Sequence, residues 1–399
     1  MTRRRLLFVC RAASSESVKS AHALAALENV EVVTADVSDI ESLMAVADDS
    51  FERIVTAQET LLEIVAIANE RLGLPGLSVE TVRNTLDKSR LKATLENAGL
   101  NTPRYKLATD LTDVNGFVSE IGFPIVLKSV VGSGALATFP IRNETDLGRV
   151  SLGESFLAEQ YITGQELCVD TITINNEPRF HSICCYQPSI LDAVEHPETQ
   201  WSCVMPREMN EFEDFIEQGL KAIRALSAGN AMTHMEGFID SAGRPWFTDA
   251  TLRPAGARIA PMLAHAYDVD PYRAWARVVV DGCFDGPWER KYAVGTIFLR
   301  GVGAGTIQQV EGIEKVQSDF GDLLVDARWP QINARKSATY TGDGFVTIRD
   351  PNTIAVQDAL SEIAQLVQIT YTSEPETQGW TNRLQNFNEL NRPAWDQAN

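Results

Sequence analysis

Short β-branched runs alternate with helical stretches over the first 72 residues, and this alternation constrains the fold more than any other feature. The runs cover residues 5–10, 30–34 and 53–56, and the helical stretches cover residues 17–27 and 59–72. Strands that alternate with helices are typical of open α/β units. We therefore expect a small α/β unit here. No G-x-G-x-x-G follows the first run, so a dinucleotide site is not expected.

The whole chain has 399 residues, which is too long for one ordinary hydrophobic core. We expect an N-terminal α/β domain at residues 1–82, a central core at 83–290 and a C-terminal α+β section at 291–399. The last section has strand patterns with glycine turns, then a helical pattern at 354–367 and a final strand at 369–372. The predicted fold class is therefore α/β combined with α+β.

The formal net charge of −19 opposes binding to phosphate backbones and anionic membrane surfaces. Neither nucleic acid nor a membrane is expected as a partner, and no apolar run reaches the roughly 18 residues that a spanning helix needs. The basic start resembles a signal peptide, but its apolar run stops after five residues at Arg11, and a buried strand is favoured. The six cysteines include no C-x-x-C pair, which fits a cytoplasmic location.

Residues 233–253 predict a β-hairpin that carries acidic side chains. If Asp240 faces Pro245 across the turn, Glu236 lies directly opposite Asp249. Like charges opposite each other destabilise a sheet unless solvent or a cation separates them. Two interpretations of this hairpin are possible: it is exposed and water solvates its acids, or the acids bind a cation.

Magnesium is the natural cation for such a pair, with Mn²⁺ as an alternative ion. Mg²⁺ accepts hard oxygen ligands and usually takes one or two carboxylates together with nucleotide phosphates. Thr251 and Arg253 continue the same strand face, adding a hydroxyl and a permanent positive charge. The hairpin therefore supplies the residue types of a metal–phosphate site.

Two lysines and a glycine loop precede the hairpin. Lys128 ends a strand-like run immediately before Gly132, Ser133 and Gly134, where small residues let backbone N–H groups approach an anion. Lys88 lies on an earlier predicted helix. Taken alone, the glycine loop is more typical of an ordinary hairpin turn, and Lys88 is more typical of a solvated lysine.

A nucleotide base and ribose have candidate contacts in the segment from Glu159 to Glu166. Apolar positions there can sandwich a flat base, backbone groups can bind its edge, and Glu166 can accept hydrogen bonds from ribose hydroxyls. The alternative is an amphipathic strand followed by a turn.

The order of these elements resembles the ATP-grasp superfamily. The chain contains these features in order: a lysine on a helix, a lysine before a glycine loop, the pattern E-x-x-x-x-G-x-E, two acids thirteen residues apart, and an arginine four residues after the second acid. The resemblance covers most of the chain and implies an ATP-grasp fold, with a Rossmann-like N-terminal domain and a two-subdomain nucleotide core.

The resemblance also implies roles for individual residues. Those at the adenine and ribose positions are Glu159, Gln160, Tyr161, Ile162 and Glu166. Those at the phosphate positions are Lys88, Lys128, Ser133 and Gly134. Those at the metal positions are Glu236, Asp249 and Thr251. The family usually has glutamate and asparagine at the last two positions, and its loop often has a further glycine.

Residues 252–259 resemble the arginine-proline-glycine segment of the branch that joins carboxylates to amines, including L-amino acid ligases. This branch implies an ADP-forming ligase in which ATP and Mg²⁺ convert a carboxylate to an acyl phosphate that an amine attacks. Arg253 and Lys128 are the implied catalytic residues. The glycine loop and the segment from Tyr186 to Arg207 are the candidate lids that exclude water.

The expected substrates are a small carboxylate and an amine, one of them an amino acid. The candidate substrate contacts are His234, Arg258 and Arg207. A structural histidine and a surface arginine ion pair are the alternatives for His234 and Arg258. A homodimer is common among relatives and is a further expectation.

Two other functions compete with this one. The first is another ATP-grasp chemistry, such as formyl or carbamoyl transfer in nucleotide synthesis. The second is a non-catalytic ATP-binding module, which the threonine at position 251 and the absent glycine favour.

Overall fold

The computed structural model describes residues 3–12, 14–132, 138–150, 156–196 and 200–373. Its N-terminal unit is a three-stranded parallel sheet in the order β2-β1-β3. The strands are β1 (Arg4–Cys10), β2 (Val30–Asp36) and β3 (Arg53–Val55). The helices are α1 (Ser15–Ala25), α2 (Ile40–Met44), the 3-10 turn η1 (Glu59–Leu61) and α3 (Leu62–Leu72). The predicted α/β unit is confirmed.

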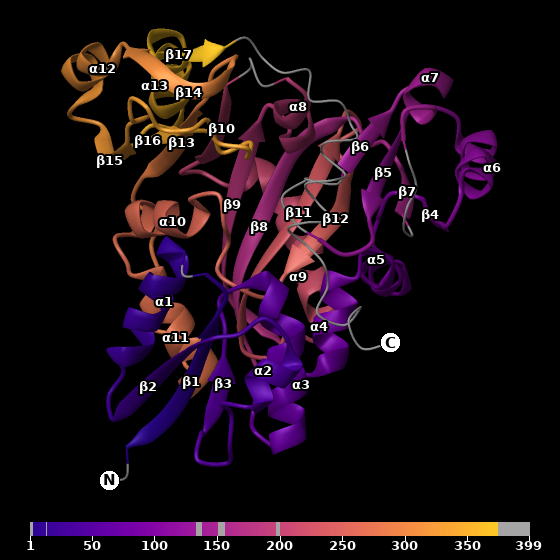
Figure 1. Ribbon diagram of the computed structural model, residues 1–399, viewed down its shortest axis with the longest axis vertical. Coiled ribbons are helices and arrows are strands. Elements are labelled where there is room, and N and C mark those ends of the chain that lie inside the picture. The colour runs from indigo at the N-terminus through magenta and orange to yellow at the C-terminus, as the bar shows by residue number, and fades with distance from the viewer. Residues whose placement is uncertain (1–2, 13, 133–137, 151–155, 197–199, 374–399) are drawn as a thin grey trace.

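Two helices and a four-stranded antiparallel sheet follow (Figure 1). The helices are α4 (Val79–Leu86) and α5 (Lys88–Asn97). The sheet has the order β4-β7-β5-β6, formed by β4 (Tyr105–Ala108), β5 (Ile125–Ser129), β6 (Thr138–Ile141) and β7 (Phe156–Gln160). Its helices are α6 (Leu111–Ile121) and α7 (Glu144–Leu147).

An eight-stranded antiparallel sheet forms the centre of the molecule, in the order β12-β11-β8-β9-β10-β13-β16-β15 (Figure 1). Its first five strands in chain order are β8 (Gly164–Ile174), β9 (Glu177–Gln187), β10 (Trp201–Met205), β11 (Ala231–Asp240) and β12 (Pro245–Thr251). The others are β13 (Ala293–Leu299), β15 (Leu324–Arg328) and β16 (Gly344–Asp350). The C-terminal section thus shares one sheet with the central core.

Helices and a small additional sheet cover the large sheet. The helices between β9 and β13 are α8 (Ile190–Glu195), the 3-10 turn η2 (Asn210–Phe212), α9 (Glu213–Ala225), α10 (Ile259–Tyr267) and α11 (Pro271–Asp281). The later elements are β14 (Ala304–Glu311), α12 (Ile313–Phe320), α13 (Thr353–Leu366) and β17 (Gln368–Ser373). The predicted final helix and strand are therefore confirmed.

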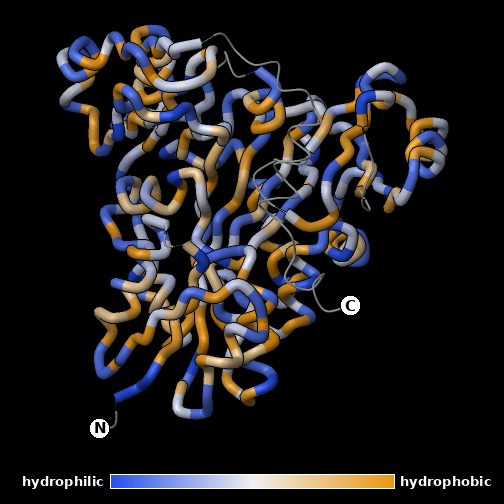
Figure 2. The backbone as a smooth tube through the Cα atoms, viewed as in Figure 1, coloured by the Kyte–Doolittle hydropathy of each residue, from blue (hydrophilic) through white to orange (hydrophobic). Residues whose placement is uncertain are grey.

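The described residues form five clusters of buried apolar side chains, some within one part of the molecule and some between parts. Apolar residues are accordingly spread through every part of the chain in Figure 2. The largest cluster joins the N-terminal unit to the rest, because Phe8 of β1 packs edge-on against Trp275 of α11 with their ring centroids 6.5 Å apart. Among the described residues, no helix is both long and apolar enough to cross a bilayer.

Candidate active site

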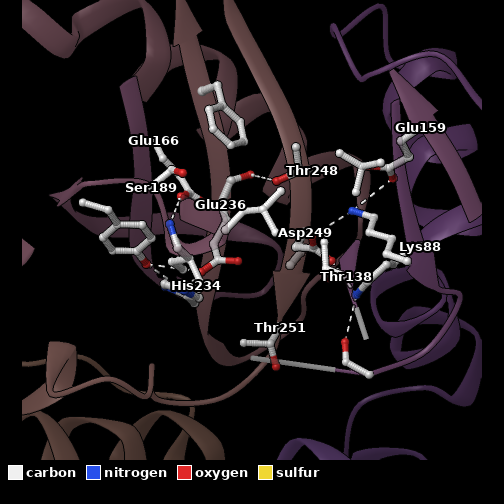
Figure 3. A pocket seen from close by; sticks show the side chains of 18 of the residues that line it. Lys88, Thr138, Glu159, Glu166, Ser189, His234, Glu236, Thr248, Asp249 and Thr251 are labelled. Atoms are coloured by element: carbon white, nitrogen blue, oxygen red, sulfur yellow. Dashed lines mark hydrogen bonds and ion pairs between the residues drawn. The ribbon is translucent and has the colours of Figure 1, made fainter. Parts of the chain in front are cut away.

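A pocket lies where the four-stranded sheet meets the β11–β12 edge of the large sheet. It receives side chains from β5, β6, β7, β8, β11 and β12, and also from η1 of the N-terminal unit. Figure 3 shows Glu236 and His234 on one side of this space, Lys88 and Glu159 on the other, and Asp249 between them. Segments far apart in the sequence therefore converge on one cavity.

The β11–β12 hairpin places Glu236 directly opposite Asp249, as predicted. The predicted route to this pairing was wrong, because Pro245 faces Ile239 and not Asp240. The register shifts by one residue between Glu236 and Gly237, so the extra residue of this bulge restores the predicted pair. Two acidic side chains thus share the pocket face.

Two lysines bind Asp249 from the opposite side of the pocket. Lys88 Nζ lies 2.5 Å from Asp249 Oδ1, and Lys128 Nζ lies 3.0 Å from Asp249 Oδ2. The Asp87 side chain caps the helix that Lys88 begins, accepting from the backbone N–H groups of residues 89 and 90. Burial opposes ionisation of Asp249, but Lys128 and Lys88 hold the pKa of this carboxyl well below its usual range.

Glu159 is buried in a second lysine cluster. Its Oε1 lies 2.7 Å from Lys92 Nζ and 3.0 Å from Lys128 Nζ. Burial lowers the pKa of Lys92 to about 8. Lys92 was not among the predicted site residues, although its spacing of four residues from Lys88 places both on one face of α5. The Glu159 carboxylate therefore contacts lysines, while residues 160–162 line the pocket beside it.

Glu166 lies on β8 with 9% of its surface exposed. Its carboxylate accepts a 2.6 Å hydrogen bond from the backbone N–H of Ile190, at the start of α8. Burial and the nearby charge of Glu236 raise the pKa of Glu166 well above its ordinary value. The acid predicted at the ribose position therefore lines the pocket and also fixes the start of α8.

His234 lies in a row of hydrogen-bonding groups at the floor of the pocket. Its Nδ1 is 2.9 Å from Asp170 Oδ1 and its Nε2 is 3.1 Å from Glu236 Oε1. The Tyr186 hydroxyl donates to the same Glu236 oxygen over 3.2 Å. Burial opposes protonation of His234, but Cys168 and Asp170 raise its pKa well above the ordinary value. Asp170 and Tyr186 were absent from the predicted site.

Arg253 reaches the pocket and contacts the N-terminal unit. Its Nη2 lies 2.7 Å from Glu59 Oε2, and both side chains are 18% exposed. Glu59 begins η1, and no spacing in the sequence relates it to Arg253. This ion pair brings the N-terminal unit to the pocket wall.

The structure does not bring the other two predicted arginines to the pocket. Arg258 pairs with Asp326 of β15, and its guanidinium lies 3.9 Å from the ring centroid of Phe345. The backbone N–H of Arg207 donates to the Thr353 hydroxyl, and its guanidinium donates to the backbone oxygen of Pro351. Both side chains are thus held by the C-terminal section.

Thr251 contributes a polar atom that the protein leaves unpaired. It is 4% exposed, lies opposite His234 and lines the pocket. Among the described residues, its Oγ1 has no hydrogen-bond partner. A buried hydroxyl without a partner is costly, so a ligand at this position would satisfy it.

Of the two segments that were predicted to be lids, the structure describes most of only one. Ser133 and Gly134 of the glycine loop lie outside the described residues. The segment from Tyr186 to Arg207 cannot move as one lid, because it contains β10, which pairs with both β9 and β13 inside the large sheet. Within it, Tyr186, Ser189, Ile190 and Leu191 line the pocket.

Comparison with known proteins agrees with this geometry. Residues 85–177 match the model of the RimK-like ATP-grasp domain. The L-arginine-specific L-amino acid ligase of Bacillus subtilis is 22% identical over 241 residues, which cover 58% of this chain and 58% of that protein. The chain thus spans just over half the length of the curated relatives that it matches.

Solved structures resemble nearly the whole chain. The L-amino acid ligase from Bacillus licheniformis superposes with a TM-score of 0.75 at 18% identity, covering 94% of this chain and all of that one. The N5-carboxyaminoimidazole synthetase from Staphylococcus aureus complexed with ADP has a TM-score of 0.70 at 14% identity, covering 91% and 97%. The chain therefore has the ATP-grasp fold, and its residues 85–177 are similar to the RimK-like ATP-grasp domain.

Proposed function

We propose that this protein is an ADP-forming, ATP-dependent ligase that joins a carboxylate to an amine, with an amino acid as one substrate. The observation that carries the proposal is the convergence of Lys88 and Lys128 on Asp249, opposite Glu236, in one pocket with Arg253. The amino acid ligases among its relatives and structural neighbours support the reaction class.

The residues in the pocket fit a hard divalent cation. Glu236 and Asp249 supply carboxylate oxygens from adjacent strands, and the unpaired Thr251 hydroxyl supplies a third oxygen. When bound, Mg²⁺ would neutralise charge on the nucleotide phosphates. Mn²⁺ prefers the same oxygen donors and is proposed as its substitute.

Lys88 and Lys128 would hold the nucleotide phosphates. In the structure both ammonium groups bind one carboxylate, whose pKa they depress. A phosphate group offers them stronger and more numerous acceptors, and a cation would then take over the carboxylate. Residues 160–162 lie along the pocket wall where the base would bind.

Arg253 would stabilise the negative charge that develops as the substrate carboxylate receives the phosphoryl group. Phosphoryl transfer requires positioning and charge neutralisation more than covalent chemistry from the protein. The Arg253–Glu59 pair would hold the guanidinium in place before the substrate binds. The amine then attacks the acyl phosphate, phosphate leaves, and an amide forms.

The test is an array of amino acids incubated with ATP and Mg²⁺, in which ADP is measured and products are identified by mass spectrometry. The proposal predicts ADP and amide in equal amounts. ADP release only with formate or bicarbonate would assign the chain to another ATP-grasp chemistry. ATP binding without turnover on any substrate would indicate a binding module.

Two variants test the assigned roles in the same assay. Asp249→Asn and Arg253→Ala should each lower turnover by at least about a hundredfold with the fold retained, because both act on developing charge. The matched controls are Asp319→Asn and Arg224→Ala, which alter exposed ion pairs outside the lining of the pocket. Full activity in either site variant would refute that residue's role.

A small-molecule substrate pair also fits the charge of the chain, whose net value of −19 disfavours nucleic acid. The cytoplasmic location and the homodimer stay predictions. Cell fractionation and light scattering of the purified protein test them directly.

A further inference from the structure

A second cluster of ligand atoms lies beside the pocket, on the same face of the large sheet. Two rows of paired residues cross strands β12, β11, β8 and β9. The first row is Asp249, Glu236, Cys168 and Cys184. The second row is Thr251, His234, Asp170 and Ser182. The β12 and β11 positions of these rows hold the proposed magnesium ligands and His234, and the β8 and β9 positions hold two thiols, a carboxylate and a hydroxyl.

The inner cluster consists of Cys168, Asp170 and His234. Their ligand atoms all lie within 4.8 Å of one another. Asp170 Oδ1 is 2.9 Å from His234 Nδ1, and Asp170 Oδ2 is 3.5 Å from Cys168 Sγ. Cys168 is fully buried and Asp170 is 3% exposed. The Asp170–Cys168 separation matches the roughly 3.3–3.6 Å expected between ligands of one tetrahedral zinc ion, and the Asp170–His234 separation is that of a hydrogen bond, which an ion would replace.

We propose that this cluster is a site for a thiophilic transition-metal ion, with Zn²⁺ as the ion that fits best. A thiolate, an imidazole nitrogen and a carboxylate are a zinc donor set, whereas Mg²⁺ requires oxygen ligands. The cluster therefore selects a different ion from the Glu236–Asp249 pair. Zinc binding would release the Cys168 thiol proton and any proton on His234 Nδ1.

A fourth ligand is available from the neighbouring strand. Cys184 faces Cys168 directly in the register of β8 and β9, is a buried free thiol and interacts with the Cys168 side chain. Cys184 is not among the three residues whose ligand atoms lie within 4.8 Å of one another, so its sulfur would have to move closer when a metal binds. The set would then be two thiolates, one imidazole and one carboxylate. Four protein ligands are typical of a closed structural zinc site.

The hydrogen bond that His234 makes outside the cluster is also of the kind found around zinc sites. A histidine that binds zinc through one ring nitrogen usually donates its other N–H to a carboxylate. His234 places Nδ1 in the cluster and Nε2 3.1 Å from Glu236 Oε1. Bound zinc would keep Nε2 as the donor and so orient Glu236, which would connect the two ion sites. His234 and Tyr186 line the pocket, through which an ion would enter.

The test uses Co²⁺ as a spectroscopic substitute for Zn²⁺ in the chelator-treated full-length protein. The proposal predicts one equivalent of Co²⁺ with a thiolate-to-cobalt charge-transfer band and the visible bands of a tetrahedral ion. Zn²⁺ should abolish both, and a large excess of Mg²⁺ should leave them unchanged. Absence of the charge-transfer band would overturn the proposal.

Variants locate the ion. Cys168→Ser should weaken the charge-transfer band, and Cys168→Ser combined with Cys184→Ser should abolish it, while Cys283→Ser should retain it, because Cys283 is exposed. If Cys168→Ser fails to fold, Asp170→Asn provides the second test and should weaken Co²⁺ binding by about tenfold or more. A band that survives the double substitution and disappears in Cys283→Ser would indicate adventitious binding at surface thiols and would refute the site. The result is independent of ligase activity, because the readout is metal binding.

Discussion

At the scale of single residues, Thr251 is the most informative departure from the ATP-grasp pattern. The structure buries its hydroxyl on the pocket wall without a partner among the described residues. Such an atom reduces stability unless a ligand satisfies it. Its position beside Asp249 supports a role toward the metal ion in place of asparagine.

Thr251→Val tests this role because valine has nearly the same shape. We expect the Mg²⁺ concentration that gives half-maximal ADP release to rise by at least about tenfold, since even the groups that only support the ligands of a metal site cost about tenfold or more when removed. The free energy of unfolding without Mg²⁺ should not fall, since no protein hydrogen bond is lost. Thr251→Ser keeps the hydroxyl and should resemble the wild type. An unchanged Mg²⁺ requirement in the valine variant would argue against metal contact.

Sequence alone could predict some site residues and not others. Glu236 and Asp249 follow from the period-two pattern of a hairpin, which fixes which side chains share a face. Glu59 and Tyr340 line the same pocket, but they come from distant segments whose approach depends on tertiary packing. Arg258 was misplaced because a cation–π contact with Phe345 is invisible in the local sequence.

At the scale of elements, the bulge in the β11–β12 hairpin sets the acidic pair. Gly237 follows the register shift, and a Cβ at this position would lie 2.1 Å from the backbone oxygen of Trp246. Only glycine permits this approach of the two strands. The bulge was not predicted because nothing in a period-two pattern marks an inserted residue.

Gly237→Ala should therefore lower the free energy of unfolding by at least about 2 kcal/mol, because the backbone must move to admit the methyl group. Chemical denaturation measures this change. Gly148→Ala is the matched control, since it has negative φ and its Cβ would meet no atom closer than 3.5 Å. Equal stability of the two variants would show that the hairpin can relax and that the bulge is not required.

The turn of the same hairpin should make the stability of the fold depend on pH. Asp240 accepts hydrogen bonds from the backbone N–H of Arg244 and from the Trp246 indole, and these bonds lower its pKa below the ordinary value. A depressed pKa in the folded state stabilises the fold above the unfolded pKa of about 4 and loses this effect as the pH falls through the folded value.

Asp240→Asn should therefore be less stable than the wild type at pH 7, and the difference should shrink as the pH is lowered below about 4. Thermal unfolding of both proteins across this range measures it. A difference that stays constant with pH would mean that the carboxylate charge does not stabilise the turn.

At the scale of the whole molecule, the pocket exists because three structural parts meet. The four-stranded sheet brings Lys128, the large sheet brings Asp249, and the N-terminal unit brings Glu59. The α/β alternation of the first part could be predicted because it is local. The order of the eight-stranded sheet could not, since pairs such as β10 with β13 join strands that are distant in sequence.

The central claim is that a divalent ion clamps nucleotide phosphates between the acidic hairpin and the two lysines. A crystal grown with a non-hydrolysable ATP analogue and Mn²⁺, measured for anomalous scattering, tests this claim most directly. We expect a manganese peak within about 2.5 Å of the Glu236 and Asp249 carboxylates, with the phosphates against Lys88 and Lys128. A manganese ion bound elsewhere, with Asp249 still paired to both lysines, would contradict it.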